Sequence, residues 1–129
     1  MHPDAEVILQ GFQAFDEGDM ATMRGLFHEG AVWHSAGRSR FAGDFEGVDA
    51  ILAFFEDISS AATLENELHA ILADDEHVVV MTKGSASAGD HRYEGNGFFV
   101  FHVEGGKVRE AWTASFDQYA EDEFWAKVA

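Results

Sequence analysis

The chain has no cysteine among its 129 residues and only one proline, Pro3. The missing cysteines exclude disulfide bonds, thiolate metal sites and cysteine nucleophiles. No apolar run approaches the roughly 18 residues of a membrane span, and residues 1–10 lack the positive region and apolar core of a signal peptide. From these absences we expect a cytoplasmic protein.

Positive charge is also scarce, with 8 lysines and arginines against 24 aspartates and glutamates. The resulting net charge of -16 repels phosphate backbones and anionic membrane surfaces. We therefore expect neither nucleic acid nor a membrane as a partner. Apolar residues make up 47% of the chain, which is enough for one core. Because no repeat or linker divides the sequence, residues 1–129 are predicted to form a single domain.

The amino-terminal half of the chain has apolar residues at helical spacing in three segments. Aspartates suited to cap a helix precede the first two segments, and stops rich in acidic residues and glycine follow them. A short strand over residues 31–35 and a loop over residues 41–47 separate the second helix from the third. The predicted limits are Asp4 to the break at residues 17–19, Asp19 to the stop at residues 29–30, and a third helix from Val48 or Asp49.

The carboxy-terminal half changes to long runs typical of β-strands. Short turns separate neighbouring runs, so each pair should form an antiparallel hairpin. Helices first and antiparallel strands afterwards is an α+β order, in which the helices gather on one face of a curved sheet. A helical tail is expected from Tyr119. The predicted strands are residues 63–73, 77–87, 92–103 and 107–117.

Five segments, taken in order, resemble one known family: GDMATMRGLFHEGAVWHSAG, FAGDFEGVDAILAFF, LADDEHVVV, GGKVREAW and FDQYAEDEFW. From about Val7 to Trp125 the chain resembles the SnoaL-like, ketosteroid isomerase-like proteins of the nuclear transport factor 2-like superfamily. The resemblance implies three N-terminal helices packed on a strongly curved, mainly antiparallel sheet, forming a cone with an internal pocket. It also implies a small, largely apolar ligand, whereas the reaction stays open because this superfold hosts many functions.

The last hairpin is expected to turn at Gly105-Gly106, so that Glu104 faces Lys107. Counting back from this pair divides the hairpin into two faces. In relatives, the concave face lines the pocket. The pocket residues predicted on the hairpin are Phe98, Val100, His102, Ala111, Thr113 and Ser115.

The short strand over residues 31–35 should form another part of the pocket wall. Alternation points either Trp33 and Ser35 or Val32 and His34 to the interior. Alignment with the resembled family favours Trp33 and Ser35. Phe55, on the inner face of the third helix, should complete the lining.

The opposite face of the hairpin would carry Phe99, Phe101 and Trp112. An exposed apolar patch of that size usually marks an interface, and members of the resembled family often dimerise there. We expect a homodimer through this outer sheet face. The alternative is that the chain's own carboxy-terminal segment covers these aromatic side chains.

The steroid isomerase mechanism in the resembled family needs a carboxylate base, a tyrosine and a protonated aspartic acid. Alignment puts Gly11 at the tyrosine position and Ser35 at the base position. The second acid falls at Phe98 or Phe99. A phenylalanine donates no hydrogen bond, and an unactivated serine is a poor base. Ketosteroid isomerisation is therefore not expected.

The remaining candidates for acid–base catalysis are Asp117, His34 and His102. Asp117 resembles, in position, the acidic residue that polyketide cyclases of the family use, and a histidine would be its partner. Burial among aromatic side chains would raise the pKa of its carboxyl group toward neutral pH. The alternative is that Asp117 caps the helical tail.

No HExxH pair or other cluster with metal-ligand spacing is present, so no metal is expected. Patterns for nucleotide cofactors are absent as well, and no cofactor is expected. Two classes of function remain open. One is a cofactor-free enzyme of isomerase, dehydratase, cyclase or hydrolase type that acts by proton transfer. The other is a non-catalytic module that binds a small ligand or dimerises.

Overall fold

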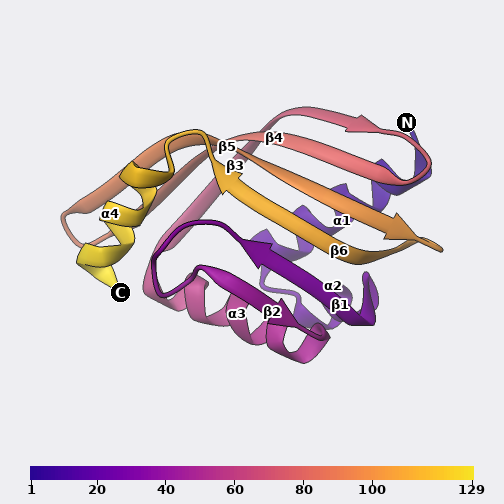
Figure 1. The fold of residues 1–129 in the computed structure, drawn as a ribbon, viewed down its shortest axis with the longest axis horizontal. Coiled ribbons are helices and arrows are strands. Elements are labelled where there is room, and N and C mark those ends of the chain that lie inside the picture. The colour runs from indigo at the N-terminus through magenta and orange to yellow at the C-terminus, as the bar shows by residue number, and fades with distance from the viewer.

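A computed structural model describes all 129 residues and places three helices on one side of a six-stranded sheet (Figure 1). The strand order is β2-β1-β6-β5-β4-β3, and all neighbours are antiparallel except β1 and β6. The sheet curves around the helices, and α4 lies where β6 ends (Figure 1). The predicted α+β class is confirmed. The elements are α1 (Pro3–Glu17), α2 (Met20–Gly25), β1 (Phe27–Ser35), β2 (Gly43–Glu46), α3 (Val48–Ala61), β3 (Thr63–Ala73), β4 (His77–Ala88), β5 (His91–Glu104), β6 (Lys107–Ser115) and α4 (Gln118–Val128).

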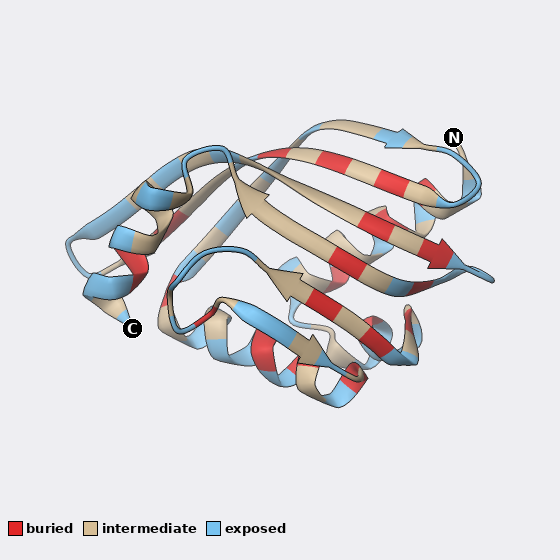
Figure 2. Ribbon diagram, viewed as in Figure 1, coloured by how far each residue is buried: buried red, intermediate tan, exposed pale blue.

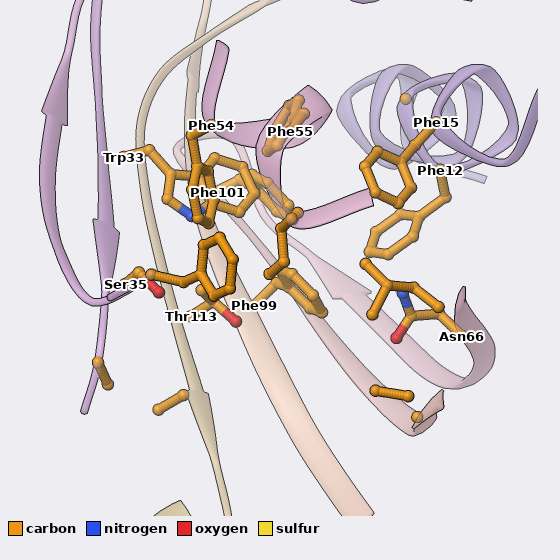
Figure 3. A pocket seen from close by; sticks show the side chains of 18 of the residues that line it. Phe12, Phe15, Trp33, Ser35, Phe54, Phe55, Asn66, Phe99, Phe101 and Thr113 are labelled. Carbon is orange, nitrogen blue, oxygen red and sulfur yellow. The ribbon is translucent and has the colours of Figure 1, made fainter. Parts of the chain in front are cut away.

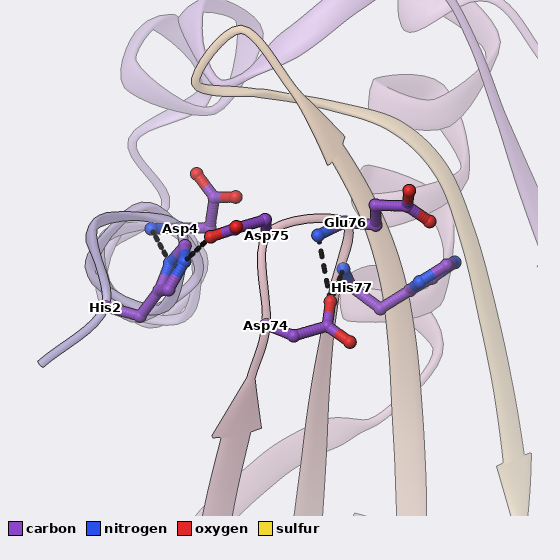
Figure 4. Close-up of polar contacts among 6 residues, drawn as sticks. All are labelled: His2, Asp4, Asp74, Asp75, Glu76 and His77. Atoms are coloured by element: carbon purple, nitrogen blue, oxygen red, sulfur yellow. Dashed lines mark hydrogen bonds and ion pairs between the residues drawn. The ribbon is translucent and has the colours of Figure 1, made fainter.

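The first helix begins at Pro3, and its cap differs from the predicted one. His2 is the N-cap residue, and its Nδ1 accepts the backbone N–H of Asp4 at 3.1 Å. Asp4 instead lies in the first turn, where a carboxylate favours the positive end of the helix dipole. The other ring nitrogen of His2 is 3.0 Å from Asp75 Oδ1 (Figure 4). The start of α1 is thereby tied to the turn between β3 and β4.

That turn is held by its own side chain, as Figure 4 shows. Asp74 Oδ1 accepts the backbone N–H groups of Glu76 and His77, each at 2.8 Å. These two bonds lower the pKa of Asp74 because they stabilise its ionised form. The turn therefore has the geometry of an Asx-type reversal.

The second helix is shorter than predicted, and two strand assignments change with it. Asp19 caps α2 as expected, since its carboxylate accepts the N–H of Thr22 at 3.1 Å. The helix ends at Gly25, however, and Phe27 already belongs to β1. The predicted loop over residues 41–47 contains the edge strand β2. Both differences come from pairing with β6 and β1, which are partners that local sequence does not reveal.

The turn of the last hairpin lies where the sequence predicts it. Gly105 and Gly106 have φ values of 61° and 79°, and a two-residue type I′ hairpin turn requires positive φ at both of these positions. Glu104 faces Lys107 as expected. The error in the predicted pairing arises further along the strands.

Strand β6 contains a bulge at Arg109, close to the turn of this hairpin. Val103 pairs with Val108 and His102 pairs with Glu110, so Arg109 is left without a partner. A shift of one residue exchanges the two faces of a strand, and the faces predicted for β5 are therefore wrong. Phe99, Phe101 and Val103 point inward, whereas Phe98, Val100 and His102 point outward.

The faces of β6 beyond the bulge agree with the prediction. Ala111 is fully buried and Thr113 lines the interior, whereas Trp112 points outward and stacks on His34 of β1. The expected outer patch thus keeps Trp112 and loses Phe99 and Phe101.

The hydrophobic core lies between the inner face of the sheet and helices α1, α2 and α3. Buried positions alternate with less buried ones along the strands, as Figure 2 shows. Val78 and Val80 of β4 are fully buried, and Phe124 and Trp125 bury the inner face of α4. No helix has the length and apolar character that a bilayer crossing demands.

Candidate functional site

A cavity of about 200 Å³ lies between the sheet and the helices (Figure 3). Of its 29 lining residues 21 are hydrophobic, so apolar contacts would dominate ligand binding. The volume exceeds that of the roughly 150 Å³ cavity that encloses benzene and is below the roughly 300 Å³ at which drug-sized sites begin. The cavity therefore fits a molecule of one or two rings.

Aromatic side chains form much of the cavity wall. Trp33 of β1 meets Phe55 of α3 edge to face, with ring centroids 5.0 Å apart. Phe99 and Phe101 of β5 have parallel rings 6.0 Å apart, and Phe12 of α1 stands edge-on to Phe99 at 5.2 Å. Such walls favour flat ring systems, which make offset and edge-to-face contacts.

Polar side chains gather where β1 and β6 end and β5 begins. Ser35 and Thr113 are register partners, and Thr113 Oγ1 donates to the carbonyl oxygen of Phe98 at 3.2 Å. The hydroxyls of Tyr93 and Ser115 form a hydrogen bond of 2.5 Å. Burial raises the pKa of the Tyr93 phenol. One end of the cavity therefore offers hydrogen-bonding groups.

Glu121 of α4 is the one carboxylate among the lining residues. Gln118 Nε2 donates to its Oε2 at 2.7 Å, and Gln118 Oε1 accepts the N–H of Ser115 at 3.0 Å. Burial raises the pKa of Glu121 most strongly, the charge of Asp122 raises it further, and the Gln118 hydrogen bond opposes both. The pKa of this carboxyl group is thus moved toward neutral pH, where a group can both donate and accept a proton.

Close packing holds α4 over this end of the cavity. Gly37 has φ of 103°, and a Cβ atom at this position would collide with Asp122 Oδ1. The other oxygen of Asp122 accepts the N–H of Arg38 at 3.1 Å. Glycine therefore allows the loop after β1 to touch the helix that carries Glu121.

The indole N–H of Trp33 has no hydrogen-bond partner in the protein, although the residue is only 6% exposed. Buried polar groups are nearly always paired, because an unpaired donor costs about 1–3 kcal/mol. This donor belongs to a residue of the cavity wall.

The structure brings four of the predicted ligand-binding residues to the cavity, namely Trp33, Ser35, Phe55 and Thr113. Ala111 is fully buried on the same inner face, without lining the cavity. Ser115 reaches it indirectly through its bond to Tyr93. Phe98 and Val100 lie on the outer face because of the bulge at Arg109.

Asp117 does not line the cavity. It is exposed, and its Oδ1 accepts the N–H of Ala120 at 3.1 Å as the N-cap of α4. These hydrogen bonds show Asp117 in the capping role, which was the alternative interpretation of this residue. Neither His34 nor His102 approaches it, since both lie on the outer face of the sheet.

His34 lies between two carboxylates on that outer face. Its Nδ1 is 2.7 Å from Asp44 Oδ1 and its Nε2 is 2.5 Å from Glu110 Oε2. The hydrogen bond to Asp44, followed by that to Glu110, raises the pKa of His34. The ring also stacks on Trp112, with centroids 5.5 Å apart. His102 lies further along the same face, against His77 at 5.2 Å.

Sequence reasoning missed five polar residues of the cavity, which are Ser39, Asn66, Ser85, Tyr93 and Glu121. Figure 3 shows Asn66 on the wall opposite Ser35. For Glu121 a signal existed, because Trp125 follows it at the i+4 spacing that shares one helix face. No group of three or more histidine, aspartate or glutamate side chains is arranged to hold a metal ion.

Comparisons with known proteins agree with this architecture. Residues 8–111 match the SnoaL-like domain. An uncharacterized protein of Mycobacterium tuberculosis is 27% identical over 126 residues, covering 95% of this chain and 96% of its own. The solved structure of Bal32a, from a soil-derived mobile gene cassette, is 36% identical with a TM-score of 0.91 and covers 95% and 96% of the two chains. TerC is 16% identical with a TM-score of 0.85, covers 96% and 98%, and shares the fold. The chain belongs to the SnoaL-like domain family.

Proposed function

We propose that the protein binds a small, largely apolar molecule in the cavity and exchanges a proton with it through Glu121, without a cofactor. The observation that carries this proposal is an aromatic cavity of about 200 Å³ with one carboxyl group of raised pKa in its wall. TerC, which has the same fold, was co-crystallized with polyporic acid, and a small organic ligand for this chain accords with that.

The chemistry follows from the surroundings of Glu121. When protonated, it can give its proton to a ligand oxygen, and when ionised it can accept a proton from an activated C–H bond. A site of low polarity strengthens either interaction because water does not screen it. Ketosteroid isomerisation is still not expected, since Gly11, Ser35 and Phe99 line the cavity without supplying its acids and base.

Binding can be tested by filling the cavity. Gly11 of α1 lines it, and a Cβ atom at this position would meet its nearest neighbour, Leu26, at 3.7 Å. Gly11→Leu should therefore occupy ligand space without a backbone clash. We expect neutral one- and two-ring compounds to raise the Tm of the wild type and of Gly25→Leu, a matched control at an exposed site, but not of Gly11→Leu. Equal shifts in all three proteins would place binding elsewhere.

Proton transfer can be tested by deuterium exchange into a bound ketone, followed by NMR in D₂O. Glu121→Gln should lower the exchange rate by roughly 10²-fold or more, the usual contribution of a positioned acid or base. The sequence-based hypothesis for Asp117 is tested in the same assay, because asparagine is an equally good helix cap. Loss of exchange in Asp117→Asn with an active Glu121→Gln would transfer the role to Asp117. The same exchange assay on variants of His34 and His102 tests the other two acid–base candidates from the sequence.

We also propose that two copies associate through the outer sheet face. Trp112, Val100 and Val79 are successive partners across β6, β5 and β4, and Leu72 continues this apolar row on β3 with 63% exposure. A second copy would remove this row from water. Sedimentation should show a dimer for the wild type and a monomer for Trp112→Glu. A monomeric wild type would contradict the proposal.

A further inference from the structure

The cavity wall combines many aromatic rings with a single formal charge. Eleven of its 29 lining residues are aromatic, none is a lysine, arginine or histidine, and Glu121 is the one acid among them. An anionic group that entered this cavity would lose its hydration and find no positive partner. A cation would instead meet one carboxylate and the faces of aromatic rings, which attract positive charge. The wall therefore favours a cationic group over an anionic one.

One carboxylate oxygen of Glu121 is free to meet such a group. Its Oε2 accepts a hydrogen bond from Gln118 Nε2, whereas its Oε1 accepts none from the protein. Trp33 Nε1 is the one buried side-chain atom that lacks a partner, so Oε1 of Glu121, which also lacks one, has accessible surface. None of the ion pairs in the molecule includes Glu121. No basic side chain of the protein therefore neutralises its charge.

The neighbours of Glu121 have no hydrogen-bond donor to spare. Gln118 Nε2 gives one hydrogen to Glu121 and the other to Asp122 Oδ1. Ser115 Oγ donates to a backbone carbonyl oxygen at 3.4 Å, so the hydroxyl of Tyr93, 2.5 Å away, gives its proton to Ser115. Burial is the main cause of the raised pKa of Tyr93, and the nearby charge of Glu121 adds to it. A donor for Oε1 must therefore come from a ligand, or from water that the ligand displaces.

We propose that the ligand carries a basic amine, which enters the cavity protonated and donates an N–H hydrogen bond to Oε1 of Glu121. This inference rests on the proposed binding function and names the polar group of the ligand for the same cavity. A charge-assisted bond is stronger than one from a neutral hydroxyl, and the aromatic rings offset part of the cost of removing the ammonium group from water. The proton of this bond can move from the nitrogen to Oε1 and back, which fits the proton exchange proposed above.

Four benzene derivatives of similar size test this assignment. Benzylamine is a cation, benzyl alcohol is a neutral donor, ethylbenzene has no polar group, and benzoate is an anion. By calorimetry, benzylamine should bind about tenfold tighter than benzyl alcohol, as the difference between a charged and a neutral hydrogen bond allows. Benzoate should bind more weakly than the other three, because its charge would be buried without a partner.

The titrations need salt, because the net charge of -16 attracts any cation to the surface of the chain. In about 1 M salt the Debye length is about 3 Å, so this surface attraction is screened, whereas a pair inside the cavity is screened much less. In ¹³C spectra of the wild type, the carboxyl signal of Glu121 should move with benzylamine and not with ethylbenzene. This shift tests the contact without any substitution.

Three variants locate the preference for the amine. Glu121→Gln removes the charge and keeps the size, so the tenfold preference should disappear while ethylbenzene still binds. Glu123→Gln is the matched control, because it removes one charge from an exposed site on the same helix, and it should keep the preference. Gly11→Leu fills the cavity and leaves Glu121 in place, so it should no longer bind benzylamine.

The outcomes separate the two proposals. If benzyl alcohol or benzoate binds the wild type as tightly as benzylamine, the amine is overturned and the binding function stands. If the preference persists in Glu121→Gln, or the carboxyl signal does not respond, the assignment of Glu121 is wrong. If Gly11→Leu binds benzylamine as the wild type does, the amine is held outside the cavity and the inference is overturned. If none of the four probes binds, the proposed function fails and this inference fails with it.

Discussion

The two faces of β5 carry similar side chains in different surroundings. On the inner face, Phe99 and Phe101 pack against Phe12 and help to line the cavity. On the outer face, Phe98 lies beside Phe116, which is 60% exposed, and neither lines the cavity. Residue type therefore does not say which face of this strand is the interior. The position of a single bulge, at Arg109, decides it.

The same contrast holds for the titratable groups on the two sides of the molecule. Inside, Glu121 is half-buried, with Gln118 as its one hydrogen-bond partner, and its pKa is raised. Outside, His34 lies between Asp44 and Glu110, and its pKa is also raised, but by favourable partners. Ionisation is thus costly in the interior and stabilising on the outer face at neutral and mildly acidic pH.

The largest effect is expected when a phenylalanine on each face of β5 is replaced by alanine. Phe101→Ala should lower the free energy of unfolding by about 3–5 kcal/mol, since it opens a space in the core. Phe98→Ala should cost less than about 1 kcal/mol, measured by chemical denaturation at low protein concentration, where any dimer dissociates. A larger loss for Phe98→Ala would mean that the strand faces are reversed and that the bulge is absent.

Removing the interior charge should give a smaller effect with a defined pH dependence. The pKa of Glu121 is raised in the folded state, so its stabilising contribution is present below the ordinary value of 4.5 and is lost as pH rises through the folded pKa. Glu121→Gln should therefore raise Tm by a few degrees at pH 8 and leave it nearly unchanged at pH 4. The amide oxygen can still accept the hydrogen bond from Gln118. If Glu121→Gln is only as stable as the wild type at pH 8, Glu121 is better hydrated than its burial indicates.

The smallest effect is expected on the outer face. The raised pKa of His34 means that its stabilisation is present below the ordinary value of 6.5 and is lost as pH rises through the folded pKa. His34→Gln should cost up to about 1 kcal/mol at pH 6, as expected for a partly exposed ion pair, and much less at pH 9. Unfolding curves at the two pH values measure the difference. An equal loss at both would assign the contribution of His34 to stacking on Trp112 instead of charge.

Local sequence patterns were enough to predict much of the fold. Periodicity located α1 and α3, the run from Thr63 to Ala73 gave β3 with both its limits, and the glycines at 105 and 106 gave the last turn. These features are local, because helical spacing, strand alternation and positive φ depend on residues close together in the chain. Alternation along β1, together with the family resemblance, also predicts Trp33 and Ser35 as pocket residues, and both line the cavity.

The inner face of β5 and the charged residue of the cavity depend on long-range contacts, which local sequence patterns do not contain. The alternation of residues along β6 gives no sign of the bulge at Arg109. One extra residue in β6 is nevertheless enough to exchange the inner and outer faces of its partner strand β5. Glu121 enters the cavity only because α4 packs across its end, where Gly37 lets the loop after β1 approach Asp122. Both outcomes depend on contacts between segments that are distant in the sequence, and local propensity carries no information about such contacts.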